Sequence, residues 1–361
     1  MLSDKSRKTV KACRFCWMCR HLCPVGLTTG KESNGPRAKA LFLSLMEKGQ
    51  PIQADAAQDM YECALCNACA ANCETGYEPA SYIRDARAAL AAQGLVPEKV
   101  QASIDTLLET GNLYGADMAE AVKALDKGAD GDILVYVGAS AAVKASENLK
   151  ALMNLMNKAG VAFKLFHGGN SSGAAEYDLL GDVAEVREIC TACADAINAQ
   201  GKKTLVVLNP TDAVMFKQNY PTWGININAQ VMTATAFVAD LVKAGALKPN
   251  KADGTVTYQD PCRLARDLEE MEPARELIAA MGYELKEMFQ SRKITKCCGG
   301  EVLASHAPEL VKNMAENRLA DAERTGAQLL VTACPGCSAV LGAADGMPVE
   351  DIFVLLDRQT D

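Results

Sequence analysis

Short apolar runs alternate with longer helical segments from about residue 130 to the end of the chain. Each run has the length and the β-branched composition of a buried strand, and the segments between the runs are rich in Ala, Lys and Leu. Strands that alternate with helices favour α/β units around parallel sheets. The predicted strands are residues 132–137, 161–166, 204–208, 255–259, 284–289 and 328–333.

The first 128 residues have a different pattern, with almost no strand signal. Residues 36–46 are expected to form a helix, because Pro36 suits a first helical turn and Gly49 follows the end of the segment. The Ala- and Arg-rich segment 79–92 is also predicted to be helical. The expected fold class is therefore α/β with an N-terminal all-α domain.

The same order of strand, glycine and turn signals occurs twice in the α/β part. The predicted strand at 255–259 matches residues 134–137, and Cys298-Gly-Gly matches His167-Gly-Gly. Such a repeat indicates two homologous α/β halves, which a turn-rich segment near residues 245–254 separates. The predicted domains are 1–128, 129–247 and 248–361.

Length, charge and hydropathy limit the possible functions. A chain of 361 residues is long enough for two or three domains, and its net charge of −8 argues against nucleic acid as a ligand. No apolar run reaches the roughly 18 residues of a membrane span, and the N-terminus lacks the apolar region of a signal peptide. We expect a cytoplasmic protein whose contact with the inner face of the membrane, if any, is peripheral and made through partners.

Two runs of four cysteines share the spacing Cys-x2-Cys-x2-Cys-x3-Cys. In this ligand pattern of two-cluster ferredoxins, the fourth cysteine of each run serves the other cluster. Structural zinc is the alternative, but zinc sites usually use two cysteine pairs and not triplets with a trailing cysteine. Clusters need reduced thiols, so disulfides are not expected. The predicted ligands are Cys13, Cys16, Cys19 and Cys73 for one [4Fe–4S] cluster, and Cys63, Cys66, Cys69 and Cys23 for the other.

Five more cysteines follow the predicted strands of the second half. The carboxyl ends of parallel strands converge on one crevice, so we expect the five thiols to meet there. Five thiols exceed the ligands of one ordinary cube, which indicates an unusual cluster, with an ordinary cube or zinc as the alternatives. These candidate ligands are Cys262, Cys297, Cys298, Cys334 and Cys337.

This third group, Cys-x34-CysCys-Gly-x34-Cys-x2-Cys, resembles the cysteine-rich CCG domain of heterodisulfide reductase subunits. The same domain occurs in the glycolate oxidase iron–sulfur subunit, lactate utilisation protein A and the iron–sulfur subunit of anaerobic glycerol-3-phosphate dehydrogenase. These proteins place a helical two-cluster ferredoxin before two CCG halves, which is the layout seen here. The resemblance implies that the five cysteines of the second half hold a noncubane [4Fe–4S] cluster.

The resemblance also implies a function. The chain would be an electron-transfer subunit between a FAD-containing partner, which oxidises a 2-hydroxy acid or a related alcohol, and an acceptor such as a quinone or another electron carrier. The alternative is a heterodisulfide-type reductase that uses the noncubane cluster itself. A redox sensor without turnover is a third interpretation. No pair of residues suggests acid–base catalysis, so we assign no catalytic residue.

The first half lacks the cysteines of the second. Ser140, Phe166, His167, Asn209 and Asp212 stand at the matching positions, so we expect no cluster there. His167, Asn209 and Asp212 either form a polar pocket or satisfy nearby backbone groups. Cys190 and Cys193 lie in the helical stretch 183–198 and are interpreted as structural cysteines.

Overall fold

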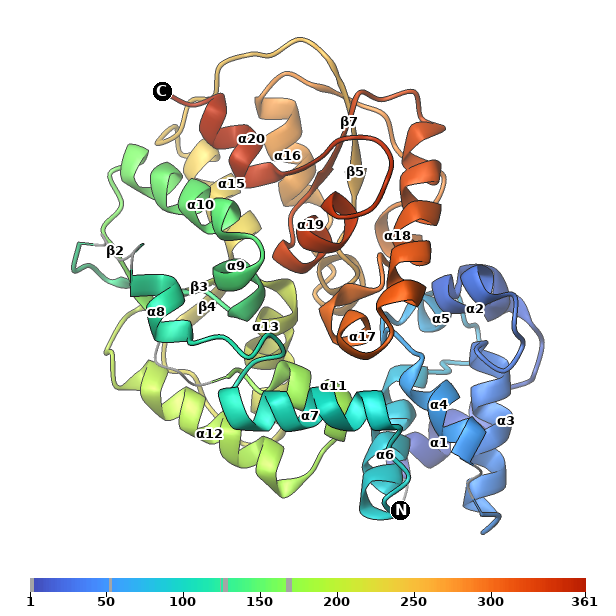
Figure 1. The fold of residues 1–361 in the computed structure, drawn as a ribbon. Helices are drawn as coiled ribbons and strands as arrows, with labels where there is room; N and C mark the ends of the chain where they lie inside the picture. Colours follow the sequence, from blue (N-terminus) through green and yellow to red (C-terminus); the bar gives the residue numbers. More distant parts are fainter. Residues whose placement is uncertain (1–2, 52–53, 124, 126–128, 167–170) are drawn as a thin grey trace.

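The computed structural model describes residues 3–51, 54–123, 125, 129–166 and 171–361. Its described N-terminal residues form helices and no strand (Figure 1). Proline is the first residue of three of these helices. It is tolerated there because the N–H groups of a first helical turn have no acceptor within the helix, so the N–H that proline lacks costs no hydrogen bond. The elements are α1 (Asp4–Ala12), η1 (Met18–Leu22), α2 (Pro24–Thr29), α3 (Pro36–Glu47), α4 (Ala54–Tyr61), α5 (Ala68–Ala71), α6 (Pro79–Ala92), α7 (Glu98–Thr110) and α8 (Met118–Lys123).

A buried arginine on α6 joins the N-terminal helices to the rest of the chain. Arg87 is 1% exposed and donates hydrogen bonds to the backbone carbonyls of Met60, Tyr61 and Cys63. It also donates to the carbonyl of Asp178 in the first α/β half. A buried guanidinium is tolerated only when its donors are paired, and here backbone oxygens pair them. The start of the second cysteine run is thereby fixed against α6.

The first α/β half is a four-stranded parallel sheet in the order β2-β1-β3-β4. Its central strands are buried apolar runs, as expected for strands that are covered on both faces. Its elements are β1 (Ile133–Tyr136), α9 (Ala139–Val143), α10 (Ser146–Lys158), β2 (Phe163–Phe166), α11 (Ala174–Leu180), α12 (Ala184–Asn198), β3 (Thr204–Val207), α13 (Pro210–Val214), η2 (Met215–Asn219), α14 (Tyr220–Thr222), β4 (Gln230–Thr233) and α15 (Ala234–Lys243).

The second half repeats this topology, with parallel strands in the order β6-β5-β7-β8. The first, second and third strands of each half thus take the same places in their sheets, as the repeat in the sequence predicts. The elements are β5 (Thr255–Gln259), η3 (Arg263–Asp267), α16 (Glu272–Ala280), β6 (Glu284–Leu285), η4 (Arg292–Ile294), α17 (Gly300–His306), α18 (Pro308–Glu323), β7 (Leu329–Thr332), α19 (Pro335–Gly342), β8 (Val349–Asp351) and α20 (Ile352–Arg358).

The two halves pack against each other through equivalent helices. α10 lies against α20, and α15 lies against α16 (Figure 1). Buried side chains from both halves, among them Leu152 and Phe353, belong to one hydrophobic cluster. The Asn148 amide donates to the Asp351 carboxylate over 2.8 Å across this interface. The halves therefore form one packed unit.

The predicted fold class is confirmed: a helical N-terminal region precedes two parallel sheets. Two edge strands, β4 and β8, were not predicted, because their residues alternate too weakly in hydrophobicity to stand out. The strand predicted at 284–289 is shorter than expected and ends at Leu285. No helix of the described residues is both long and apolar enough to cross a membrane.

Candidate functional site

Four cysteines from the two N-terminal runs line one cavity between α2, α3 and α6. Leu65 and Asn67, which flank Cys66, have left-handed backbone conformations with φ of 49° and 57°. These turns let the chain reverse between successive cysteines. Removal from water raises the pKa of the Cys23 thiol to about 12, and neighbouring thiols add to this effect. The cysteines of this cavity are Cys23, Cys63, Cys66 and Cys69, the set predicted to share a cluster.

The other four cysteines lie near the surface around η1. Phe15 and Trp17 have φ of 54° and 73°, so the first run bends in the same way as the second. Burial, followed by the charge of Cys13, raises the pKa of Cys19 to about 11. Cys16 is exposed. The electrostatic neighbours of Cys19 in the structure include Cys13, Cys16 and Cys73, which are its predicted partners.

The five cysteines of the second half line a second cavity. Cys262 follows β5, Cys297 and Cys298 precede α17, and Cys334 caps the start of α19, with Cys337 in its first turn. The sulfurs of Cys262 and Cys297 are 3.8 Å apart, and those of Cys298 and Cys337 are 3.4 Å apart. The segments that follow β5 and β7 therefore carry three of the five thiols into the crevice at the carboxyl ends of the strands.

Gly299 explains why a glycine follows the cysteine pair. Its φ is 110°, and a Cβ atom there would lie 2.9 Å from a methyl carbon of Val311 on α18. A side chain at this position would be strained in its backbone and would also clash. The close approach of this loop to α18 places Cys297 and Cys298 in the cavity.

The thiol groups fit metal clusters chemically. Cys69 lies among Cys66, Cys23 and Cys63, and removal from water raises the pKa of Cys69 well above its usual value. Deprotonated thiols packed this closely need positive charge between them, which a cluster of iron ions supplies. Within the described part of the chain, no three His, Cys, Asp or Glu side chains are gathered as they would be around one metal ion. The assignment of individual ligands stays a prediction.

The two cysteine-lined cavities share Cys63, Ala64 and Leu65, and Cys66 of one cavity packs with Cys297 of the other. Cys66 and Cys297 lie in one apolar cluster with Ala68. The Cys297 thiol and the charge of Arg266 lower the pKa of Cys66. Arg266 also donates to the backbone carbonyl of Cys66, and the Asn67 amide donates to an Asp267 carboxylate oxygen over 2.8 Å. These contacts hold the second cysteine run against the second half.

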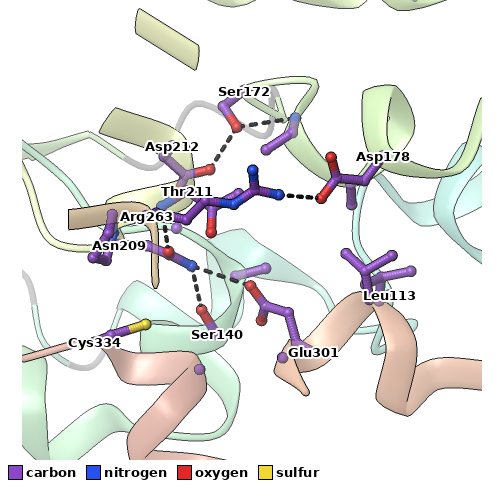
Figure 2. A pocket seen from close by; sticks show the side chains of 18 of the residues that line it. Leu113, Ser140, Ser172, Asp178, Asn209, Thr211, Asp212, Arg263, Glu301 and Cys334 are labelled. Atoms are coloured by element: carbon purple, nitrogen blue, oxygen red, sulfur yellow. Dashed lines mark hydrogen bonds and ion pairs between the residues drawn. The ribbon is translucent and has the colours of Figure 1, made fainter. Parts of the chain in front are cut away.

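Residues of the first half line the same cavity as the five thiols. Figure 2 shows Ser140, Asn209 and Asp212 at this cavity together with Cys334. The Asn209 amide donates to the Ser140 hydroxyl over 2.8 Å and to Glu301 over 3.1 Å. The Tyr114 hydroxyl donates to the other Glu301 oxygen over 2.6 Å. Asn209 and Ser140 stand where the second half has cysteines, and these altered positions line the same cavity as the thiols.

Asp212 also lines this cavity, and it accepts a hydrogen bond from the Ser172 hydroxyl over 2.5 Å. Burial raises the pKa of Asp212 to about 7. Gly138 faces this carboxylate, because a Cβ atom at Gly138 would lie 2.6 Å from an Asp212 oxygen. His167, the third member of the proposed polar pocket, lies outside the described residues.

Sequence reasoning missed Glu301 and Tyr114. Glu301 follows the CysCys-Gly-Gly motif directly, and that position was a usable signal for a residue at the cavity. Tyr114 lies after α7 and gave no signal. Cys190 and Cys193 are both buried in α12, where desolvation raises the pKa of each thiol to about 12. Their place in a helix core agrees with the structural interpretation.

Comparisons with known proteins agree with this arrangement. Residues 9–77 match the 4Fe-4S dicluster domain family, and residues 256–342 match the cysteine-rich CCG domain family. The two matches confirm the resemblance inferred from the cysteine spacing.

Relatives match over most of the chain. Over 388 residues the chain is 27% identical to a subunit of the dihydromethanophenazine:CoB–CoM heterodisulfide reductase of Methanosarcina acetivorans, in an alignment that covers 96% of this chain and 92% of the relative. It is 19% identical to the glycolate oxidase iron–sulfur subunit of Escherichia coli, with coverages of 97% and 94%. It is 26% identical to the EtfAB:quinone oxidoreductase of Syntrophomonas wolfei over 86% of this chain but only 46% of that relative.

Proposed function

We propose that this protein, which joins a 4Fe-4S dicluster domain to a CCG domain, is the iron–sulfur electron-transfer subunit of an oxidoreductase complex. The observation that carries the proposal is the contact between Cys66 and Cys297. It joins a predicted cluster ligand of the N-terminal region to a predicted ligand of the second half. Adjacent ligands of two centres are the arrangement that electron transfer within one chain needs.

The protein's part is to hold the metal centres and to exclude water between them. The proposed ligands are the two sets of four thiols in the N-terminal runs and the five thiols of the second half, for two [4Fe–4S] clusters and a third, noncubane one. Such clusters, when bound, accept and release single electrons at potentials that burial and hydrogen bonds tune. Ala68 and Leu22 pack around the Cys66–Cys297 contact, and Arg266 orients the backbone of Cys66.

The partners are proposed from the relatives. The relatives named as a glycolate oxidase subunit and as an EtfAB:quinone oxidoreductase take part in oxidoreductase complexes. We propose a FAD-containing partner that oxidises a 2-hydroxy acid or an alcohol, and a quinone or another carrier as the acceptor. We assign no acid–base pair for substrate chemistry to this chain, and we propose that hydride passes from the substrate to the flavin of the partner.

Anaerobic purification with iron and sulfide counting tests the cluster content. About 12 irons per chain are expected for three four-iron clusters, and a flavoprotein should copurify. A chain with about 8 irons would contradict the third cluster. A colourless protein with free N-terminal thiols would refute the electron-transfer function.

The contact that carries the proposal has its own test, the variant Arg266→Ala. This change removes the hydrogen bonds that the guanidinium donates to the carbonyls of Cys66, Lys293 and Thr295. Iron content should be retained, whereas rapid-freeze EPR should show slower arrival of electrons at the third centre. Arg324→Ala, which removes an exposed arginine, is the control. Equal rates in both variants would contradict a role for this contact.

A small-molecule reductase is the second candidate, and the cavity is the observation that favours it. The five thiols and four polar side chains, Ser140, Asn209, Asp212 and Glu301, line the same cavity, which offers a place for a ligand beside the third centre. Reduced viologen and a disulfide test this function: two electrons and two protons convert one disulfide into two thiols. Turnover that Cys298→Ala abolishes and Cys193→Ala retains would support the reductase, and absence of turnover would exclude it for disulfides.

A further inference from the structure

The two N-terminal cysteine runs correspond position by position. Phe15 corresponds to Leu65 and Trp17 to Asn67, and all four have positive φ. The backbone of both runs is therefore bent in the same way between its cysteines. Because the two backbones are alike, a difference in the surroundings of the two runs does not come from how each run folds. We attribute it to what each run binds.

The second run is covered by the second α/β half. Leu65 is 2%, Cys66 8% and Ala68 1% exposed. Asn67 is hydrogen-bonded to Asp267, and the thiol of Cys66 contacts Cys297. This face of the run is thus an interface between two redox centres.

The corresponding face of the first run is uncovered. We call Arg14, Phe15, Cys16, Trp17 and Met18 the first-run face. Its three large apolar side chains are 40%, 43% and 56% exposed, and its arginine and its thiol are also exposed. Aromatic residues, methionine and arginine are the residue types enriched at protein interfaces. Large side chains exposed side by side around a predicted cluster ligand mark an interaction surface.

Charge identifies the kind of partner. Residues 3–23 contain six Lys and Arg and one acidic residue, whereas the whole chain has a net charge of −8. Four of the six cations are paired with acidic side chains, but Arg14 on the first-run face and Lys8 have no ion-pair partner among the described residues. The Arg37 guanidinium lies 3.8 Å from the centre of the Trp17 ring, and that of Arg20 lies 5.2 Å from it. These cation–π contacts hold the indole ring in place before any partner binds. A basic, preorganised face is complementary to an acidic one.

We propose that the first-run face is the docking site of a separate redox protein whose own cofactor lies within an acidic surface. This protein would cover the first run as the second half covers the second run. The inference rests on the proposed function, because it assumes that a cluster is bound at the first run. It adds where an electron enters or leaves the chain and which surface chemistry selects the partner.

Stopped-flow kinetics on the iron-loaded protein test the proposal, with flavodoxin hydroquinone as the acidic probe. One electron leaves the hydroquinone, which becomes the semiquinone, and the iron–sulfur protein gains one electron. Arg14→Glu should lower the second-order rate constant about tenfold at low ionic strength, and the difference should shrink at high salt. Trp17→Ala should lower it at every salt concentration. Lys243→Glu, which makes the same change in net charge on α15, should leave it unchanged.

A basic probe reverses the expected sign. Oxidation of the reduced protein by ferricytochrome c should become faster in Arg14→Glu, because the face loses its repulsion for a basic protein. Rates in Arg14→Glu that follow those in Lys243→Glu would overturn the proposal. The proposal would also be overturned if Trp17→Ala abolished binding to anionic lipid vesicles, or dimerisation, and left the rates with flavodoxin unchanged. Reduction by dithionite distinguishes failure of the docking site from failure of the proposed function. A protein that dithionite reduces, but whose rates with flavodoxin do not respond to Arg14→Glu or Trp17→Ala, refutes only the docking site. A protein that dithionite cannot reduce refutes the proposed function.

Discussion

Asp178 joins all three parts of the molecule, and its replacement by asparagine should destabilise the fold. This α11 carboxylate accepts from Arg84 on α6 over 2.6 Å and from Arg263 in η3 over 2.8 Å. The three side chains are at most 12% exposed. Removing one partner from a buried ion pair costs about 3–5 kcal/mol, because the remaining charge is left buried and uncompensated. Arg263 keeps a second partner, Asp267, so we expect the lower end of this range.

The loss translates into a measurable shift in melting temperature. With an unfolding entropy of about 2 cal/mol/K for each of the 361 residues, this lower end corresponds to a fall of roughly 4 °C in the melting temperature of iron-loaded Asp178→Asn at neutral pH. Circular dichroism under anaerobic conditions measures this shift. Asp182→Asn is the matched control, because Asp182 pairs with Arg187 at the surface and is worth at most about 1 kcal/mol. Equal shifts in both variants would refute the reasoning.

The ion pairs of Asp178 with Arg84 and Arg263 also determine how the stability of the protein depends on pH. Burial opposes ionisation of Asp178, but the charges of Arg263 and Arg84 outweigh it and lower the pKa of this carboxyl. The contribution of the Asp178 carboxylate to stability is therefore fully present above the ordinary aspartate pKa of about 4. It is lost as the pH falls through the lowered pKa that Asp178 has in the folded protein. The difference between wild type and Asp178→Asn should shrink in that acidic range. A difference that grows on acidification would contradict the assignment.

Three further changes test the site. Cys69→Ser should reduce the iron content from about 12 to about 8 per chain, whereas Cys193→Ser should retain it, as colorimetric iron assay would show; equal iron in both would remove Cys69 from the ligands. Gly299→Ala should lower the melting temperature and the occupancy of the third centre, because its Cβ would meet Val311 at 2.9 Å, and wild-type values would contradict that clash. Asp212→Asn should gain stability relative to wild type as the pH rises from about 4 to about 7, because burial raises the pKa of Asp212 to about 7 and opposes ionisation of the buried carboxyl. Urea titrations at several pH values measure the difference in unfolding free energy between the two proteins. A difference that does not change with pH would contradict the raised pKa.

Local patterns in the sequence predicted much of the fold. Strand and helix signals are strong where a segment is buried on both faces, as in β1, β3, β5 and β7. They are weak in the edge strands β4 and β8, which pair on one side only and in which only one residue of each strand is fully buried. The repeat within the α/β part also carried information, because it required the two sheets to share one strand order.

The sequence predicted only those residues of the site that belong to a single local motif. Cysteine spacing indicated which thiols lie together, because short gaps in a turn fix neighbours. The contact of Cys66 with Cys297 and the wall formed by Tyr114, Glu301 and Asn209 depend on how the three parts pack. Residues far apart in the chain meet there, and no periodicity or spacing in one segment contains that information.

Arg87 has a consequence for how the sequence can vary. Its guanidinium is satisfied by main-chain oxygens of Met60, Tyr61, Cys63 and Asp178, and every amino acid supplies such an oxygen. Side chains at positions 60 and 61 can therefore be exchanged without breaking these bonds, provided that the backbone keeps its path. Only the arginine itself is irreplaceable in this arrangement, since lysine presents a single ammonium group where a planar fork is needed.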